Sequence, residues 1–283
     1  MKHYHKISIV TISYNQGSFL EQTLKSAFDQ NYPNLEYILI DAGSTDNTHE
    51  IIARYKDKIA YTVSEKDNGP SDGLNKGFSK ATGEIFYYLN SDDMLLPGSL
   101  DFFNDYYTQN PGYDVYYGHC LIEMHNPLKV YKAYSDKWDT SLFMTGQITM
   151  LQPSTFFRGE FFSKHLKFNT ENDTGWDGEL LADAAIHKAK FLRFNKMVSL
   201  FRLYPDSISG TNSEERNKRF RFQTDRYYDR MRAAGYSKVS KSGLSLKFTK
   251  FLRDPVIMIK RIFSINNRII KNWKRAYTKA AQA

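Results

Sequence analysis

The chain has 283 residues, of which 41% are hydrophobic and 25% are charged. This length and balance exclude a small disulfide-stabilised domain and a mainly disordered chain, and they predict a folded protein with a sizeable core. The single cysteine, Cys120, excludes a disulfide framework and a cysteine-based metal cluster. No apolar run approaches the roughly 18 residues of a membrane span, and the first residues lack the pattern of a secretion signal, so we expect a cytoplasmic protein.

The net charge of +8 is unevenly distributed. Residues 211–283 contain 19 lysines and arginines against 5 acids, a balance of +14, whereas residues 1–210 carry a balance of −6. A basic segment of this kind favours a polyanionic partner, either nucleic acid or an anionic membrane surface. An acidic body that binds a phosphorylated ligand usually needs a metal ion to do so. The sequence therefore predicts two regions with different partners.

Short β-branched runs alternate with helical patterns over the first 110 residues. The expected elements are a strand at Lys6–Tyr14, a helix that opens with a capping box at Ser18–Glu21, a strand at Leu35–Ile40, a helix at Thr48–Tyr55, a strand at Ile59–Ser64, a helix at Ser71–Lys80, a strand at Glu84–Leu89 and a helix at Gly98–Gln109. Four strands, each followed by a helix, predict an α/β fold with a mostly parallel sheet covered on both faces.

The pattern becomes less regular after residue 113. We expect a strand at Asp114–Glu123, loops around Pro127 and Pro153, a helix near Glu179–Ala189 and a strand at Phe191–Leu203.

Polar residues follow each of the first four strands where it ends. These segments are Thr11–Asn15, Asp41–Asp46, Glu65–Gly69 and Asn90–Asp93. Open parallel sheets bind ligands just beyond the carboxyl ends of their strands, so we expect the ligand site there. The sequence contains neither GxGxxG nor GxxxxGK[ST], so a dinucleotide site and a P-loop are not predicted, and phosphates must be held in another way.

Two adjacent carboxylates, Asp92 and Asp93, follow the fourth strand. They repel each other unless they share a cation. A hard divalent ion such as Mg²⁺ or Mn²⁺, which also bridges a diphosphate, would supply that compensation. The alternative is that the pair caps the helix that begins near Gly98 and forms a solvated turn.

Asp41 ends the second strand and precedes a turn of small residues that would let a ligand approach. Its carboxylate can accept a hydrogen bond from a pyrimidine ring N–H. The alternative, an Asx-turn that caps the helix near Thr48, explains Asp46 better than Asp41. Tyr14 could stack on a base or fill a gap in the core, and Asp72 could cap its own helix.

Four segments of the chain match motifs of the family 2 glycosyltransferases, so the chain resembles this family and its GT-A nucleotide-sugar-binding fold. The segments, within residues 6–100, are Val10–Asn15, Ile40–Thr48, Gly69–Gly77 with Ala81–Glu84, and Leu89–Asp93. The resemblance implies that donor-binding residues are Thr11, Tyr14, Asn15, Asp41, Asp72 and Asp92. It places Tyr14 and Asp41 at the nucleobase, and Asp92 and Asp93 at the ribose and the metal-bound diphosphate. A stricter pattern would read Asp-x-Asp where this sequence has Asn90-Ser91-Asp92, so the metal ligand remains open between Asp92 and Asp93.

The second half of the chain resembles the family in three shorter segments, Gln152–Arg158, Trp176–Leu181 and Phe201–Ser209. In the family the first acid of the second segment usually acts as general base, and this role transfers to Asp177. Glu179 is the runner-up, because the alignment can shift by two positions, and an N-cap role is the alternative for Asp177. The candidates for the acceptor or diphosphate side are Gln152, Ser154, Arg202 and Tyr204, with a purely structural strand end as the alternative for the last two.

The tail from residue 213 interleaves basic and aromatic residues and predicts helices. Apolar residues at three- or four-residue steps between Val256 and Tyr277 predict a basic amphipathic helix, which is typical of a membrane interface. The alternative is a helix packed on its own domain or on a partner. No nucleic-acid-binding motif accompanies the charge, so nucleic acid is not expected. Truncation after Gly210 is expected to leave a soluble enzyme.

Together with the resemblance, the sequence predicts an inverting, metal-dependent glycosyltransferase that uses Mn²⁺ or Mg²⁺. It would move a sugar from a nucleoside-diphosphate sugar to a hydroxyl of a glycan or lipid-linked acceptor in cell-envelope polysaccharide synthesis. UDP is the favoured nucleotide because it is common in the family that the chain resembles. The expected organisation is a GT-A domain at 1–210, with a nucleotide-sugar-binding half at 1–110 and an acceptor half at 111–210. A basic helical tail at 211–283 would bind the anionic inner face of the cell membrane. The alternative is a non-catalytic nucleotide-sugar or polyanion-binding module of the same fold.

Overall fold

The computed structural model covers the chain and describes all residues except 1, 125–129, 206, 211–212, 240–242 and 267–283. The strands are β1 (Ile7–Ser13), β2 (Leu35–Asp41), β3 (Tyr61–Ser64), β4 (Ile85–Tyr88), β5 (Met94–Leu95), β6 (Val115–Met124), β7 (Val130–Ala133), β8 (Thr155–Arg158) and β9 (Phe191–Leu203). The helices are α1 (Gly17–Phe28), α2 (Thr48–Arg54), α3 (Pro70–Phe78), α4 (Ser99–Gln109), α5 (Thr140–Phe143), α6 (Gly159–His165), α7 (Trp176–Ile186), α8 (Glu214–Ala233), α9 (Gly243–Arg253) and α10 (Pro255–Asn266).

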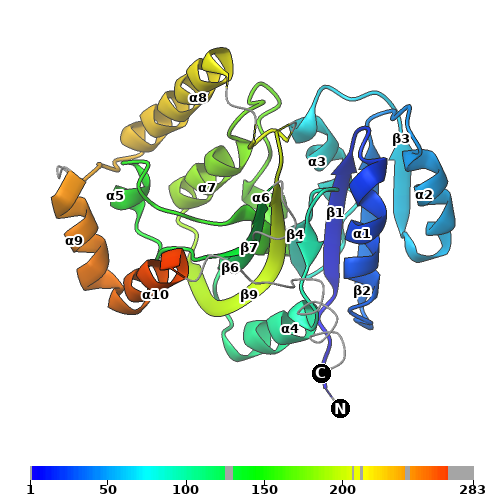
Figure 1. Cartoon of the computed structure of the whole chain (residues 1–283), viewed down its shortest axis with the longest axis horizontal. Helices are drawn as coiled ribbons and strands as arrows, with labels where there is room; N and C mark the ends of the chain where they lie inside the picture. Colours follow the sequence, from blue (N-terminus) through cyan, green and yellow to red (C-terminus); the bar gives the residue numbers. More distant parts are fainter. Residues whose placement is uncertain (1, 125–129, 206, 211–212, 240–242, 267–283) are drawn as a thin grey trace.

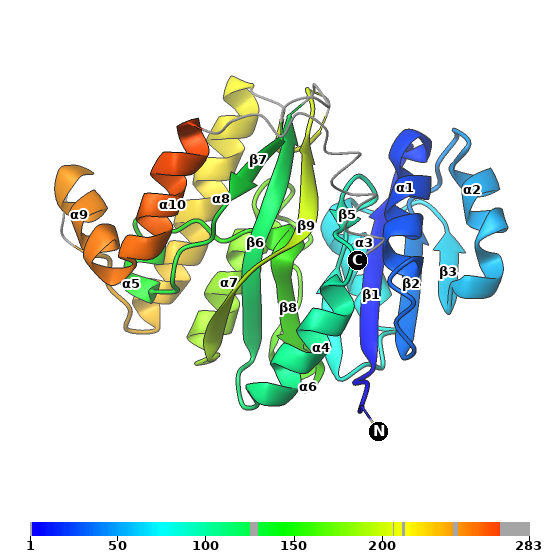
Figure 2. The same ribbon diagram turned by 60° about the horizontal axis from the view of Figure 1, so that its bottom comes forward.

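The described strands form one sheet in the order β3-β2-β1-β4-β8-β6-β9-β5, with β7 paired to β6. In the first half of the chain β1 runs parallel to β2 and β4, and β2 runs parallel to β3, as the sequence predicted. β8 is antiparallel to both β4 and β6, and β6 and β9 run side by side in parallel (Figure 2). The parallel half therefore presents the carboxyl ends of β1 to β4 at one edge.

Successive side chains of β1 and β2 point to opposite faces of the sheet, and both faces are covered. Val10 packs in one core with Leu74 of α3, whereas Ile9 packs in a second core with Leu20 of α1. Because both faces of the sheet are buried, the sequences of these strands are mainly apolar and do not alternate strictly with polar residues. Gly77 lets α3 approach β1 closely, since a Cβ at that position would lie 2.3 Å from a methyl carbon of Val10.

Several predicted boundaries are wrong. The capping box does not form, because α1 begins at Gly17 with Gln16 at its N-cap and no side-chain cap. α7 begins at Trp176, three residues earlier than predicted. The short elements β5, β7, β8, α5 and α6 were not predicted, and the segment around Pro127 lies outside the described residues.

The predicted helix at the start of the basic tail is α8, and it packs on the rest of the chain. Tyr227 and Met231 are buried in the same core as Leu180 of α7. The alternative of a helix packed on its own domain therefore describes α8, while the functional division at residue 210 remains a prediction. α9 and α10 follow at the same end of the molecule (Figure 1). In the described part of the chain, no helix has the length and apolar character needed to cross a membrane.

Candidate functional site

The predicted acid pair lies at the carboxyl end of β4, beside the end of β9. Asp93 is fully buried: its Oδ1 accepts a hydrogen bond from the backbone N–H of Arg202 at 3.0 Å, while its Oδ2 has no hydrogen-bond partner among the described residues. Asp92 is partly exposed, and its Oδ2 accepts a hydrogen bond from the hydroxyl of Tyr204 at 3.0 Å. Burial raises the pKa of Asp92, and burial together with the Asp92 charge raises the pKa of Asp93 well above its ordinary value.

Arg202 anchors the backbone beneath this pair. It is only 4% exposed, and its Nη1 donates to the carbonyl oxygen of Asp92 at 2.8 Å. Its Nη2 donates to Oε1 of Gln22 on α1 at 2.7 Å. Arg202 therefore joins β9, α1 and the segment after β4. The structure adds Gln22 to the site, for which the local sequence carries no signal.

The oxygen atoms at this edge fit a divalent cation. Oδ2 of Asp93 and Oδ1 of Asn90 are both buried and lack hydrogen-bond partners in the described structure. Carboxylate and amide oxygens are ligands that Mg²⁺ and Mn²⁺ prefer. The alternative helix-capping role does not hold, because α4 begins at Ser99 with Gly98 at its N-cap.

Asn15 ties the loop after β1 to the loop after β2. Its Oδ1 accepts from the backbone N–H of Thr45, and its own N–H donates to the hydroxyl of Ser44, both at 2.8 Å. Its φ of 51° lies in the left-handed region, which asparagine tolerates better than most residues. The neighbouring Tyr14 is 61% exposed, so it does not fill a gap in the core.

Asp41, at the end of β2, is fully buried and held by hydroxyl groups. Its Oδ1 accepts from the hydroxyl of Ser44 at 2.5 Å, and its Oδ2 accepts from the hydroxyl of Ser64 at 2.5 Å and from the N–H of Ser44 at 3.0 Å. Asp46 accepts from the N–H of Thr48 at 3.0 Å and so forms the Asx-turn that the sequence indicated, although the N-cap of α2 is Asn47, which has no side-chain cap.

Two of the remaining candidate residues are buried in the core. The hydroxyl of Thr11 is 2.6 Å from the hydroxyl of Tyr37. Ser154 donates to the carbonyl oxygen of His119 at 2.7 Å and lies 2.6 Å from the hydroxyl of Ser199. Both side chains therefore bond within the protein interior.

Gln152 and Asp72 lie closer to the rim of the sheet. Gln152 donates to the carbonyl oxygen of Tyr88 at 3.0 Å and accepts from Nδ2 of Asn90 at 3.3 Å, so it borders the acid pair. Asp72, in the first turn of α3, accepts from the N–H of Asn68 at 3.1 Å.

Asp177 is the second residue of α7 and is partly exposed. Burial raises its pKa above the ordinary value of an aspartate. It is not the N-cap, a position that Gly175 occupies. The hydroxyl of Ser71 donates to the carbonyl oxygen of Asn172 at 3.2 Å, which places the segment before α7 against the start of α3.

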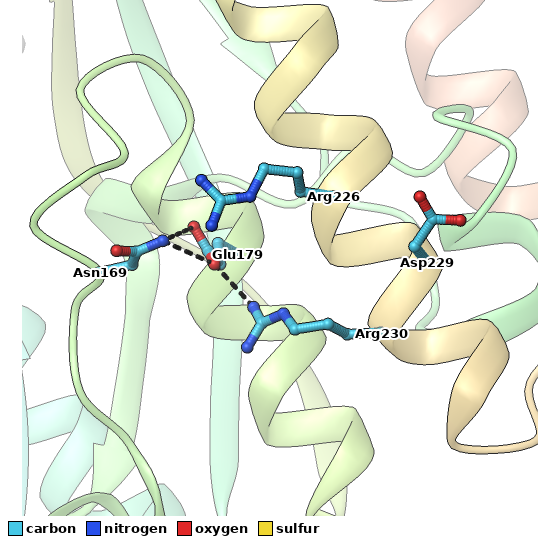
Figure 3. A pocket seen from close by; sticks show the side chains of 5 residues that line it. All are labelled: Asn169, Glu179, Arg226, Asp229 and Arg230. Carbon is cyan, nitrogen blue, oxygen red and sulfur yellow. Dashed lines mark hydrogen bonds and ion pairs between the residues drawn. The ribbon is translucent and has the colours of Figure 1, made fainter.

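Glu179, the runner-up, takes part in an ion-pair network between α7 and α8 (Figure 3). Its carboxylate accepts from Nδ2 of Asn172 at 2.7 Å, from Nδ2 of Asn169 at 3.1 Å and from Nη2 of Arg230 at 2.7 Å. Arg230 also lies 2.9 Å from Asp183. These side chains border a pocket of about 330 Å³, which is lined by Asn169, Glu179, Arg226, Asp229 and Arg230.

Apart from the buried Thr11 and Ser154 and the ion-paired Glu179, the candidate residues form two connected groups and two positions on neighbouring helices. The first group consists of Asn90, Asp92, Asp93, Gln152, Arg202 and Tyr204. The second consists of Asn15 and Asp41, joined through Ser44, with Tyr14 next to Asn15 in the chain. Asp72 and Asp177 come from helices whose N-terminal regions meet.

The family model "Glycosyl transferase family 2" matches residues 8–163 of the chain. Among curated proteins, the GalNAc(5)-diNAcBac-PP-undecaprenol beta-1,3-glucosyltransferase of Campylobacter jejuni is 29% identical over 213 residues, which cover 72% of this chain and 67% of that protein. An uncharacterized glycosyltransferase of Rickettsia typhi is 30% identical over 207 residues, which cover 65% of each. The chain therefore spans about two thirds of the length of these relatives.

Among solved structures, S. aureus TarS 1–349 matches with a TM-score of 0.58 at 21% identity, over 70% of this chain and 60% of that one. The same protein in complex with UDP-GlcNAc gives 0.59 at 16% identity, over 86% and 77%. The mannosyltransferase PcManGT from Pyrobaculum calidifontis, in complex with GDP-Man and Mn²⁺, gives 0.55 at 15% identity, over 99% and 86%. The expected GT-A fold is confirmed by these likenesses.

Proposed function

The chain belongs to glycosyl transferase family 2, a family of sugar-transferring enzymes, and from this premise we propose that it transfers a sugar, with inversion, from a nucleoside-diphosphate sugar to a hydroxyl group. The observation that carries this proposal is the acid pair, in which the buried Oδ2 of Asp93 has no hydrogen-bond partner among the described residues. Such a pair needs a cation, and a cation there would bridge to a diphosphate. UDP is the proposed nucleotide, and TarS, which shares the fold, is known in complexes with UDP and UDP-GlcNAc.

In this proposal the base stacks on the exposed ring of Tyr14. The cluster of Asp41, Ser44 and Ser64 supplies the acceptor for a pyrimidine N–H, and Asn15 fixes the loop that carries Tyr14. Thr11 supports this rim from inside the core.

Asp92 and Asp93, together with Oδ1 of Asn90, would hold Mn²⁺ or Mg²⁺. When bound, the ion neutralises charge on the leaving diphosphate. We assign Asp92 to the diphosphate side, since it is partly exposed and is oriented by the hydroxyl of Tyr204. Asp93 supports it from beneath, with one oxygen fixed by the N–H of Arg202.

Asp177 is the proposed general base. It would accept the proton of the acceptor hydroxyl while that oxygen bonds to the anomeric carbon and the bond to the diphosphate breaks, so that a single displacement inverts the configuration. A pKa raised by burial makes its carboxylate a stronger base than an ordinary aspartate. Glu179 is not given this role, because its oxygens are already hydrogen-bonded to Asn169, Asn172 and Arg230.

A lipid-linked acceptor at the inner face of the cell membrane completes the proposal. The name of the Campylobacter relative specifies an undecaprenol-linked substrate. Large apolar side chains are exposed on α9 and α10: Phe248, Phe251, Leu252, Val256, Ile259 and Ile262. The same two helices carry five basic residues and no acid, and Asp254 lies between them. We assign to this surface, the α9–α10 face, the contact between the 211–283 region and an anionic membrane, with the polysaccharide of the cell envelope as the product class.

Product analysis tests the chemistry. The purified protein is incubated with UDP-sugars and Mn²⁺, and release of UDP is expected. Release of pyrophosphate would instead indicate nucleotidyl transfer, and donor binding without either product would indicate a binding module. In calorimetry, Asp92→Asn is expected to weaken Mn²⁺-dependent donor binding, whereas Asp105→Asn, on the exposed surface of α4, serves as the control. Unchanged donor affinity in Asp92→Asn would contradict the metal role.

Sedimentation with anionic liposomes tests the membrane contact. Phe248→Asp is expected to release the protein from the liposomes. Phe222→Asp on α8 is the matched control, because both side chains are 62% exposed and only Phe248 belongs to the α9–α10 face. Equal binding by the two variants would remove this face from the proposal.

A further inference from the structure

Two histidines precede β1 and one glutamate precedes β4, at the edge of the sheet opposite the acid pair. One ligand atom from each of His3, His5 and Glu84 lies within 4.8 Å of the others. Nδ1 of His5 is 2.9 Å from Oε2 of Glu84, and the rings of His3 and His5 meet edge to face with centroids 4.5 Å apart. The three side chains therefore converge on one point.

The backbone that carries the histidines is held in place from beneath. The buried Asn104 accepts from the N–H of His5 and donates to the carbonyl oxygen of His3, both at 3.0 Å. The hydroxyl of Tyr32 donates to the carbonyl oxygen of His5 at 2.7 Å. Nε2 of His5 lies 3.1 Å from Oγ1 of Thr108, and an imidazole that binds a metal typically has its second nitrogen hydrogen-bonded in this way.

We propose that His3, His5 and Glu84 bind one Zn²⁺ ion, separate from the acid pair and outside the transfer reaction. His5 would bind through Nδ1 and Glu84 through Oε2, with a ring nitrogen of His3 as the third ligand and water as the fourth. Two imidazoles and one carboxylate suit Zn²⁺ better than Mg²⁺ or Mn²⁺.

The geometry needs only a small adjustment to receive the ion. Ligand atoms around a tetrahedral zinc ion lie about 3.3 Å apart. His3 and Glu84 are exposed, so rotation of their side chains can close the longer separation without moving the backbone. The bound ion would cross-link the segment before β1 to the segment before β4 and, through Thr108, to α4.

Calorimetry of the full chain tests the site. Zn²⁺ is titrated in the presence of excess Mg²⁺, which would occupy the metal site proposed at the acid pair. One Zn²⁺ is expected to bind, and His3→Ala or Glu84→Gln is expected to weaken its affinity by at least about tenfold. His165→Ala is the matched control, since the His165 ring contacts that of His187 at 4.9 Å without belonging to the three-residue cluster.

Co²⁺ provides a second readout that distinguishes the two metal sites. A four-coordinate site with nitrogen ligands gives strong visible absorption, whereas a six-coordinate oxygen site gives weak absorption. The strong bands are expected in the native chain and in Asp92→Asn, and are expected to be lost in His3→Ala. The proposal is overturned if His3→Ala binds Zn²⁺ as the native chain does, or if Asp92→Asn is the variant that loses the Zn²⁺.

Discussion

Substitutions of the two acids in the first turn of α7 are expected to differ: Asp177→Asn should lower turnover and spare stability, whereas Glu179→Gln should spare turnover and lower stability. Asp177→Asn is expected to lower kcat by about 10²–10⁴, the range that a general base contributes. Its effect on the free energy of unfolding should stay below about 1 kcal/mol, because a partly exposed acid near a helix N-terminus contributes only about 0.3–1 kcal/mol. Donor affinity should be retained, since Asp177 is assigned to the acceptor's proton.

Glu179→Gln is expected to leave kcat within about threefold and to destabilise the fold. The substitution removes the charge that receives hydrogen bonds from Asn172 and Arg230, both at 2.7 Å. A hydrogen bond to a charged group is worth about 1.5–3 kcal/mol. Because Arg230 is 47% exposed, solvent screens its share, so the expected loss is about 1–3 kcal/mol in total.

Steady-state kinetics at saturating Mn²⁺ and urea unfolding, both on the same preparations, measure the two effects. A general base must be ionised to accept a proton, and the pKa of Asp177 is raised by burial. Turnover should therefore rise as the pH rises through that pKa, and this rise should be absent from the pH profile of Asp177→Asn. Native turnover in Asp177→Asn, or a hundredfold loss in Glu179→Gln with unchanged stability, would refute the assignment of the base.

Three further predictions concern stability. Truncation after Gly210 removes Tyr227 and Met231 from the core, so the shortened chain should be insoluble or unfolded by circular dichroism, contrary to the expectation from sequence. Met231→Ala in the full chain should cost about 2–5 kcal/mol in urea unfolding. Burial lowers the pKa of His119 to about 4 from 6.5, so the imidazole is neutral in the folded protein. The unfolded chain binds the proton more tightly, so about 3 kcal/mol of the free energy of unfolding should be lost as the pH falls from 6.5 to 4. His119→Gln should flatten that part of the curve of unfolding free energy against pH.

The residues at the ends of the first strands could be predicted because their signals are local. A buried strand followed by acids or small residues predicts the position of Asp41 and Asp92 at the carboxyl edge of the sheet, while the roles of the two residues stay a prediction. The partners of these acids could not be predicted in the same way. Arg202 contacts both acids from β9, and Gln22 of α1 in turn contacts Arg202; no local pattern records a contact between residues so far apart in the sequence.

The missed strand β8 shows the same limit. Thr155–Arg158 has only four residues, and it is a strand because it fits between β4 and β6, with Phe156 paired to both Tyr87 and Tyr116. Its antiparallel direction breaks the βα alternation on which the sequence prediction relied. So short a segment forms a strand because it pairs with a neighbouring strand on each side, and this pairing can be seen only in the folded sheet.

The tail shows why a charge count does not identify a partner. Arginines of α8 are paired within the protein: Arg219 with Asp173 and Arg226 with Glu171. On α9 and α10, Lys250 and Arg261 both lie 2.7 Å from Asp136. Charges already paired contribute less than the roughly 1 kcal/mol that a free lysine or arginine gains near an anionic surface.

Membrane binding through the α9–α10 face should therefore depend more on its apolar side chains than on its charge. Raising the salt from about 0.1 M to 1 M shortens the Debye length from about 10 Å to 3 Å and removes most of the electrostatic share. Liposome binding by the native chain should weaken under this change but persist, whereas Phe248→Asp should abolish it at both salt concentrations. Complete release of the native chain by salt would show that charge holds it there, and the apolar residues of α9 and α10 would then need another explanation, such as contact with a partner protein.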